Sequence, residues 1–400
     1  MNIFKKCYCR MYQGVFRIVL PLMPYREPNI LDSVLDIKEV LRDKNVSNIL
    51  LVTDNGLRNL GLTKELEDDL NHNGYNLTVF DAVVPNPTIS NIEECYQLYI
   101  DKNCEAIVAF GGGSVMDCAK IVGARVVKPK LSVNKMKGVL KINKKLPTLI
   151  AVPTTAGTGS EVTVAAVITD ETTHYKYAIN DFCLIPEYAV LDYKTTIGLP
   201  PMLTATTGLD ALTHAIEAYI GRSTTKYTRA KALEAIKLIY ENLYLAYKDG
   251  NNADARRNML HASYLAGIAF TRSYVGYVHA VAHSLGGQYG VAHGLANAII
   301  LPYFLDEYRP VIDKKLANVS RMLQLSDDND DNKVAADRFV NWLKELNSKM
   351  NIPTKIKELK EEDIPSLAKR ADKEANPLYP VPKLMNAHQL EKMYYKLLAK

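Results

Sequence analysis

Gly208-Leu-Asp-Ala-Leu-Thr-His214 is the stretch that decides how this chain is interpreted. It lies in an apolar, helix-favouring run, and residues four apart leave the same face of a helix. Asp210 and His214 are therefore expected on one face. The later sequence Val278-His-Ala-Val-Ala-His283 repeats this spacing with His279 and His283. The pattern predicts two helices that each present a pair of metal-binding side chains.

A third histidine follows a glycine-rich segment. Gly286-Gly287 and Gly290 are expected to break the helix, so that the chain turns back and His293 reaches the other histidines. Neutral imidazoles with one carboxylate suit a divalent first-row metal such as Fe(II) or Zn(II). One pair alone would be explained by an amphipathic helix with a hydrogen-bonded histidine. Two pairs and a third histidine favour a metal site, whereas the other four histidines show no such pattern: His72, His174, His261 and His388.

These motifs resemble the iron-dependent (group III) alcohol dehydrogenases, from about Asn48 to the Asn376-Pro377 segment. In that family an Asp-x3-His pair and two later histidines fourteen residues apart bind the metal. The resemblance implies Fe(II), or alternatively Zn(II), with four ligands: Asp210, His214, His279 and His293. The family has a non-ligand histidine at the position of His283, which is expected either to relay a proton or to support the metal ligands.

Composition limits the class of protein. With 400 residues and 48% apolar content, the chain can bury a large core and suggests two domains. The net charge of +5 predicts no nucleic-acid partner, and the lysine-rich run 128–145 has no aromatic residue and is expected to be a solvated loop. Six cysteines without a Cys-x-x-Cys pair indicate a reduced, cytoplasmic protein. The apolar run 14–23 is too short to span a bilayer, so no membrane partner is expected.

Between Asn48 and Leu199 the sequence alternates strands and helices. Continuous apolar runs predict buried parallel strands, and the alternation predicts an open, Rossmann-like parallel sheet. The first thirty residues fit either a hairpin or a short helix. The predicted strands are 48–54, 75–80, 106–110 and 148–152.

Gly111-Gly-Gly-Ser-Val-Met-Asp117 lies where a strand meets a helix. Glycines let the backbone approach a phosphate, and the amides of a helix start attract its charge. The spacing of Ser114 and Asp117 also fits a helix-capping pair. Because this is not a Gly-x-Gly-x-x-Gly fingerprint, dinucleotide binding does not follow from the loop alone. The threonine-rich loop 153–161, after the next strand, offers hydroxyl and amide donors at the same edge of the sheet.

The family resemblance assigns these segments to a nicotinamide cofactor. It implies that the glycine loop and the threonine loop bind the cofactor, with Asn86 and Lys176 in the same site. Asp54 ends the first predicted strand, where the adenosine ribose of NAD is expected, so NAD is favoured and NADP remains possible; Asp54 would otherwise cap the following turn. The implied cofactor-binding residues are Asp54, Asn86, Gly111, Gly112, Gly113, Ser114, Asp117, Thr154, Thr155, Thr158 and Lys176.

Long helical patterns replace the strands near Leu199: 201–220, 226–247 and 253–270. We therefore expect an α/β dinucleotide-binding domain at residues 1–199 and an all-helical, metal-binding and catalytic domain at residues 200–400. This is the dehydroquinate synthase-like, iron-alcohol-dehydrogenase fold that the resemblance implies, with the active site in the interdomain cleft.

The expected activity is hydride transfer between a primary alcohol or aldehyde and a nicotinamide. Arg272, Tyr274 and Tyr277 are bulkier than the residues of many relatives, and Arg272 and Tyr274 are expected to shape the substrate end. The alternatives are a glycerol-dehydrogenase-like zinc polyol dehydrogenase and, from another class, a metal-dependent hydrolase. The resemblance also implies a homodimer or a larger homo-oligomer.

Overall fold

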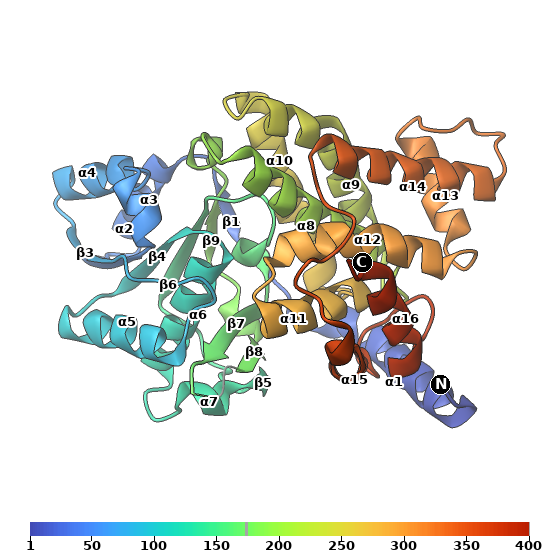
Figure 1. The fold of residues 1–400 in the computed structure, drawn as a ribbon. Helices are drawn as coiled ribbons and strands as arrows, with labels where there is room; N and C mark the ends of the chain where they lie inside the picture. The colour runs from blue at the N-terminus through green and yellow to red at the C-terminus, as the bar shows by residue number, and fades with distance from the viewer. Residues whose placement is uncertain (173–174, 400) are drawn as a thin grey trace. The chain divides into compact units, whose positions relative to one another are not determined.

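The computed structural model describes the whole chain except Thr173, His174 and Lys400 (Figure 1). His174, for which no role is expected, therefore lies outside the described residues. The chain forms two compact units, Pro24–Gly198 and the combination of Met1–Met23 with Leu199–Lys400. The first 23 residues thus differ from the expected division, because they pack with the helical unit.

The unit Pro24–Gly198 contains an open sheet of six parallel strands in the order β1-β9-β6-β4-β2-β3. The predicted parallel sheet is confirmed, although β1 and β9 were not expected. The strands are β1 (Asn29–Leu31), β2 (Asn48–Val52), β3 (Asn76–Phe80), β4 (Ala106–Gly111), β6 (Thr148–Pro153) and β9 (Tyr188–Val190).

Buried strands explain the continuous apolar runs. Residues alternate along β2, so that Leu50 and Val52 join a core cluster on one face while Ile49 and Leu51 join a cluster on the other. Helices cover both faces, which excludes water from the sheet on each side. These helices are α2 (Ile37–Asp43), α3 (Asn55–Asn59), α4 (Lys64–His72), α5 (Ile89–Asp101), α6 (Gly113–Val127) and α7 (Val133–Met136).

A second, three-stranded sheet in the same unit was not expected from the sequence. Its strands are β5 (Gly138–Val139), β7 (Ala165–Asp170) and β8 (Tyr175–Asn180), in the order β5-β8-β7. The antiparallel pair β7 and β8 follows the threonine loop, and the amide of Val167 in β7 donates to Asp117 in α6. This small sheet therefore braces the start of α6.

The second unit is helical, with α8 at its centre. Every residue of α8 from Gly208 to Ile220 is buried, which fits its apolar character on all sides. The remaining helices are α1 (Ile3–Val19), α9 (Lys226–Lys248), α10 (Ala253–Thr271), α11 (Tyr277–Tyr289), α12 (His293–Tyr308), α13 (Asp313–Met322), α14 (Asn332–Lys349), α15 (Ile364–Ala375) and α16 (Ala387–Leu397).

Helix α1 resolves the two alternatives for the first thirty residues in favour of a helix. Its side chains Arg10 and Gln13 donate hydrogen bonds to backbone carbonyls of the segment 377–382. These bonds explain why α1 belongs to the helical unit. Within the described residues, no helix is long and apolar enough to cross a membrane.

Candidate active-site residues

Four side chains converge in the helical unit. Asp210 and His214 come from α8, His279 from the first turn of α11, and His293 from the first position of α12. Each offers one ligand atom, and these atoms all lie within 4.8 Å of one another. The structure thus brings together the four residues that the sequence singled out, and we refer to them as the His-Asp cluster.

The His-Asp cluster is tight and largely buried. Asp210 Oδ1 lies 3.5 Å from His293 Nε2 and 3.9 Å from His279 Nε2. The rings of His214 and His279 stack with centroids 4.4 Å apart. Burial and the neighbouring histidines lower the pKa of His279 well below its ordinary value, so its imidazole is neutral. Its buried Nε2 has no hydrogen-bond partner among the described residues, which leaves a lone pair directed into the cluster.

Glu217 supports the His-Asp cluster, and the sequence interpretation missed it. Its carboxylate accepts hydrogen bonds from His279 Nδ1 at 2.7 Å, from the Gly276 amide at 2.7 Å and from the Val278 amide at 3.0 Å. The bond to Nδ1 fixes the tautomer of His279 and turns Nε2 toward Asp210. Burial raises the pKa of Glu217 to about 7. A signal existed, because an acidic residue seven positions after Asp210 lies on the same face of a buried helix.

Two glycines allow the helices of the His-Asp cluster to approach closely. A Cβ atom at Gly294 would lie 2.5 Å from the backbone oxygen of Thr206, and one at Gly276 would lie 2.5 Å from Glu217 Oε1. Any side chain at Gly294 would push α12 away from α8. The short distance between His293 and Asp210 therefore depends on glycine at position 294.

The turn between α11 and α12 differs from the prediction. Gly286 and Gly287 lie inside α11 and do not break it. The helix ends at Gly290, whose φ of 71° is in the left-handed region that favours glycine. Asn297, one turn into α12, was also missed: its Nδ2 donates to Asp210 Oδ1 at 2.7 Å and lies 3.1 Å from His293 Nε2.

His283 lies beside the His-Asp cluster without being one of the four. Its ring stacks on that of His293 with centroids 5.1 Å apart, and its Nδ1 donates to Glu374 Oε1 at 2.6 Å. The same carboxylate oxygen accepts the hydroxyl of Tyr379. The side chains packed around the ring partly desolvate it and oppose the charged form of His283, but Glu374 more than offsets this effect, so the pKa of His283 is raised. Because its side chain is 40% exposed, a proton on Nε2 can exchange with solvent.

The bulky residues before His279 have different surroundings. Tyr277 is fully buried, and its hydroxyl donates to Met385 O and Asn376 Oδ1. It is therefore a core residue. Arg272 lies over the ring of Tyr227 at 5.1 Å. Tyr274 packs edge-on against Phe16 of α1, with ring centroids 5.0 Å apart. These two contacts lie outside the His-Asp cluster, so the role of Arg272 and Tyr274 at the substrate end stays a prediction.

The glycine loop lies at the carboxyl end of β4, where α6 begins. Gly112 is the N-cap of α6 and supplies no side-chain hydrogen bond to the helix, so amides of the first turn remain available for a ligand. The capping alternative is wrong, because Ser114 Oγ accepts the amide of Asn86 at 3.1 Å and Asp117 faces β7 and the threonine loop. An uncapped helix start beside glycines fits a phosphate group.

The threonine loop lies directly beside the glycine loop, because β4 and β6 are neighbours in the sheet. The Thr154 amide donates to Gly111 O at 3.1 Å, and a Cβ atom at Gly113 would lie 3.0 Å from Thr158. Thr155 lies next to Gly112. The predicted cofactor residues of these two loops are thus neighbours.

Asp117 belongs to a buried polar group at the base of the loops. Its carboxylate accepts the Ser160 hydroxyl at 2.9 Å, and the Lys120 ammonium donates to the same hydroxyl oxygen at 2.9 Å. Burial lowers the pKa of Lys120 to about 8 and raises that of Glu161 to about 7. Asp117 therefore positions the threonine loop through its hydrogen bond with Ser160. Lys176 lies on β8 opposite Thr169, and burial lowers its pKa.

Asp54 follows β2, the other neighbour of β4. Its Oδ1 accepts the amide of Leu57 at 3.0 Å, so it caps α3. Capping uses one carboxylate oxygen, and the residue stays half-buried at the carboxyl edge of the sheet. The capping role is thus present, and the ribose role is compatible with it.

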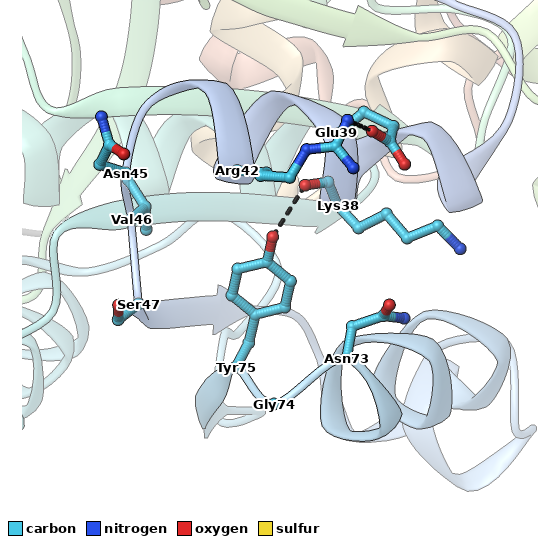
Figure 2. Close-up of a pocket in the computed structure, with 9 residues that line it drawn as sticks. All are labelled: Lys38, Glu39, Arg42, Asn45, Val46, Ser47, Asn73, Gly74 and Tyr75. Atoms are coloured by element: carbon cyan, nitrogen blue, oxygen red, sulfur yellow. Dashed lines mark hydrogen bonds and ion pairs between the residues drawn. The ribbon is translucent and has the colours of Figure 1, made fainter.

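A surface hollow of about 450 Å³ lies elsewhere in the same unit (Figure 2). Its lining includes Ser47, directly before β2, and Tyr75, directly before β3, so it lies at the amino ends of the strands. The hydroxyl of Tyr75 donates to the backbone oxygen of Lys38 at 2.8 Å. Ligands of open parallel sheets bind at the opposite edge, where the glycine loop is. This hollow is therefore separate from the candidate cofactor site.

Comparison with known proteins identifies the family of the chain. Residues 31–193 match the family model of iron-containing alcohol dehydrogenases, and residues 204–398 match the C-terminal model of the same family. Alcohol dehydrogenase 4 of Saccharomyces cerevisiae is 40% identical over 337 residues, which cover 83% of this chain and 86% of that protein.

Two solved structures extend the similarity to the fold. A 1,3-propanediol oxidoreductase superposes with a TM-score of 0.90 at 34% identity and covers 94% of this chain and 99% of its own. Sulfoacetaldehyde reductase from Bifidobacterium kashiwanohense, solved in complex with NAD+, superposes with a TM-score of 0.83 at 29% identity and covers 93% of this chain and 98% of its own.

The fold and the matches define an oxidoreductase with a Rossmann-like domain and a helical domain. More specifically, the chain belongs to the iron-containing alcohol dehydrogenase family. It is an alcohol dehydrogenase, an enzyme that interconverts alcohols and aldehydes. This membership is favoured over the two alternatives, the zinc polyol dehydrogenase and the hydrolase.

Proposed function

We propose that the His-Asp cluster binds one divalent metal ion, Fe(II), through Asp210, His214, His279 and His293. The support is the convergence of their ligand atoms within 4.8 Å and the buried Nε2 of His279, which has no hydrogen-bond partner within the part of the chain that the structure describes. Three imidazoles and a carboxylate fit iron and also zinc. The name of the family favours iron.

The nicotinamide cofactor is NAD, bound at the glycine and threonine loops. The uncapped start of α6 receives the pyrophosphate, while Thr154, Thr155 and Thr158 provide hydroxyl or amide donors. Asn86, Ser114 and Lys176 line the same site, Asp117 positions it, and Asp54 accepts hydrogen bonds from the ribose. One relative, the sulfoacetaldehyde reductase, was solved with NAD+, which supports this choice over NADP.

The substrate is a primary alcohol or the matching aldehyde. When bound, the metal supplies a Lewis acid for the substrate oxygen and NAD accepts the hydride. His283 receives the hydroxyl proton at Nε2, because Glu374 holds the other ring nitrogen, Nδ1. Glu217 keeps His279 oriented throughout.

The setting of the enzyme is also a proposal. The six cysteines are free thiols, which is consistent with a reducing cytoplasm. The homodimer or larger homo-oligomer that the resemblance implies stays a prediction, to be checked by light scattering.

The decisive experiment measures metal content and turnover of the Fe(II)-loaded enzyme by nicotinamide absorbance with a series of primary alcohols. In His279→Ala we expect most of the metal and the activity to be lost, because a ligand is removed. In His283→Ala, the matched control one helical turn away, we expect full metal content and turnover lower by about 10²- to 10⁴-fold.

Two results would contradict the assignment. Wild-type metal content in His279→Ala would place the metal elsewhere. Metal loss in His283→Ala equal to that in His279→Ala would make His283 a ligand or its direct support and end the relay proposal.

A further inference from the structure

Helix α1 exposes a continuous apolar stripe. The stripe follows alternating steps of four and three residues, the spacing that keeps side chains on one face of a helix. Most of these side chains are more than half exposed, and a large apolar surface in water indicates an interaction site. The members on α1 are Phe4 (83% exposed), Tyr8 (52%), Met11 (65%), Val15 (58%) and Ile18 (72%), and Leu22 (80%) follows just beyond the end of the helix.

The opposite face of α1 is already occupied. Cys9, Gln13 and Leu20 are buried, and their spacing of four and seven residues places them together on one face. Arg10 and Gln13 bond to carbonyls of 377–382, while Lys5 pairs with Asp372 of α15 at 3.1 Å. The helix is therefore fixed to the helical unit with its apolar stripe turned outward.

The charge of this segment identifies the kind of partner. Residues 1–26 contain five basic residues, Lys5, Lys6, Arg10, Arg17 and Arg26, and no acidic residue. Lys6 and Arg17 are exposed, and with Arg10 they fall on one flank of the helix because they are four and seven residues apart. Residues 1–26 supply no acidic side chain with which a second copy of α1 could pair these basic residues.

We propose that α1 binds the surface of a membrane that contains anionic lipids. An amphipathic helix with apolar side chains on one face, basic side chains on its polar side and no acidic residue lies in the interface of such a bilayer. Tyr8 suits this position because its ring is apolar and its hydroxyl is polar. The stripe would enter the boundary between headgroups and acyl chains, while Lys6 and Arg17 contact the lipid phosphates.

This surface departs from the expectation that the protein has no membrane partner. That expectation depended on the absence of a spanning segment, and α1 does not span a bilayer. The inference is independent of the proposed catalytic residues, because none of them lies on α1. An alcohol dehydrogenase placed at a membrane surface would meet alcohols and aldehydes that partition into lipid.

The test is sedimentation of the full-length enzyme with phosphatidylcholine vesicles that do or do not contain phosphatidylserine. The wild-type protein is expected to sediment with the anionic vesicles. The variant Met11→Gln/Val15→Gln/Ile18→Gln removes three stripe residues and should bind at least about a hundredfold more weakly.

A matched control removes the same number of exposed apolar side chains elsewhere in the helical unit. Leu245, Val311 and Val334 are 50%, 60% and 45% exposed, and changing all three to Gln should leave vesicle binding unchanged. Alcohol oxidation in both triple variants should equal that of the wild type, which shows that they are folded.

A charge variant provides a second measurement that does not alter the apolar stripe. Lys6→Gln/Arg17→Gln should weaken binding to the anionic vesicles by about fivefold for each charge removed. The proposal is overturned if wild-type enzyme stays in the supernatant, or if the control triple variant loses as much binding as the α1 variant. It is also overturned if the α1 triple variant binds vesicles like the wild type but has a smaller oligomeric mass in solution. The stripe would then be a contact between copies of the chain.

Discussion

Glu217 accepts three hydrogen bonds at once, two from backbone amides and one from His279. In Glu217→Gln, the amide nitrogen replaces one acceptor oxygen, so at least one donor loses its partner and His279 loses its fixed orientation. We expect metal affinity to fall by roughly 10- to 100-fold. Metal titration monitored by calorimetry measures this change.

The control for this variant is Glu241→Gln, an exposed glutamate of α9 in the same unit. It should titrate like the wild type. Unchanged metal affinity in Glu217→Gln would show that His279 is oriented by its packing alone.

Glu161 predicts a pH dependence of stability. It is 1% exposed, and burial raises its pKa from 4.5 to about 7. Between these values the folded protein keeps a proton that the unfolded chain releases. The free energy of unfolding therefore falls as the pH rises from about 4.5 to about 7, by on the order of 3 kcal/mol. In Glu161→Gln the share of this fall that Glu161 contributes should be absent, since the amide does not ionise, whereas the share of Glu217, whose pKa burial also raises to about 7, remains.

Urea unfolding followed by circular dichroism at pH 5 and pH 8 measures the difference. The wild type should lose more stability between the two pH values than Glu161→Gln does. Glu94→Gln, an exposed glutamate on α5, should behave like the wild type. Equal losses of unfolding free energy in the wild type and in Glu161→Gln would mean that other ionisable groups determine the pH dependence of stability.

At the residue scale, spacing singled out Asp210, His293 and three other histidines, and the family resemblance selected from them the four members of the His-Asp cluster; their support was not predicted. The spacing of four residues placed Asp210 and His214 on one face because both lie in one straight helix. Glu217 and Asn297 were missed because their partners come from other helices, and the sequence does not show which helices meet. Tyr277 was noted only as a bulky residue before His279, because the sequence does not show that its hydroxyl bonds to the distant Met385.

At the element scale, Asp54 serves both the start of α3 and the proposed cofactor site. Asp54→Asn keeps a side-chain oxygen for the cap but removes the charge that would repel the extra phosphate of NADP. We expect it to shift the ratio of catalytic efficiencies toward NADP by about tenfold or more, because two like charges near a surface repel by a few kcal/mol before screening.

Asp54→Gly removes both the cap and the charge. Comparing it with Asp54→Asn, which keeps the cap, separates the effect of the charge on cofactor preference from the effect of the cap on stability. Asp54→Gly should relax the cofactor preference as far as Asp54→Asn does, while losing only about a few tenths of a kcal/mol of stability, because glycine is itself tolerated at an N-cap position. Wild-type preference for NADP, or no shift in either variant, would refute the ribose assignment.

Elements with a strong apolar period were predictable, whereas elements defined by distant partners were not. Helices α8, α9 and α10 lie where the pattern placed them, because each is long and apolar enough to be central. Helix α1 was left undecided because its apolar stripe faces outward, against the usual rule. Strands β7 and β8 were missed because they pair mainly with each other, outside the parallel sheet that the alternation predicted.

At the scale of the whole molecule, the two compact units should respond separately to their ligands. The single tryptophan, Trp342, lies on α14 in the helical unit, so its fluorescence follows that unit alone. Fe(II) at about 100 times its Kd should increase the free energy of unfolding of the helical unit by about 2.7 kcal/mol. NAD should instead raise the midpoint temperature of the calorimetric transition of the unit Pro24–Gly198. Fluorescence does not follow this transition, because that unit contains no tryptophan.

Calorimetry and fluorescence on the same sample make this comparison. Heat-denaturation of the His279→Ala variant with added Fe(II) is the control, in which the fluorescence transition should not move. A single transition shifted equally by both ligands would show that the units unfold together.

The docking of α1 also has a consequence for synthesis on the ribosome. Its partners, the carbonyls of 377–382, are made more than 350 residues after Gln13. At typical translation rates this interval lasts roughly 20 to 70 s. During that time the nascent helix has neither face covered, and the continuous segment Pro24–Gly198 can fold before the rest of the helical unit exists. We therefore expect chains that stop before residue 377 to be recognised by chaperones, and their first twenty residues to be the site of capture.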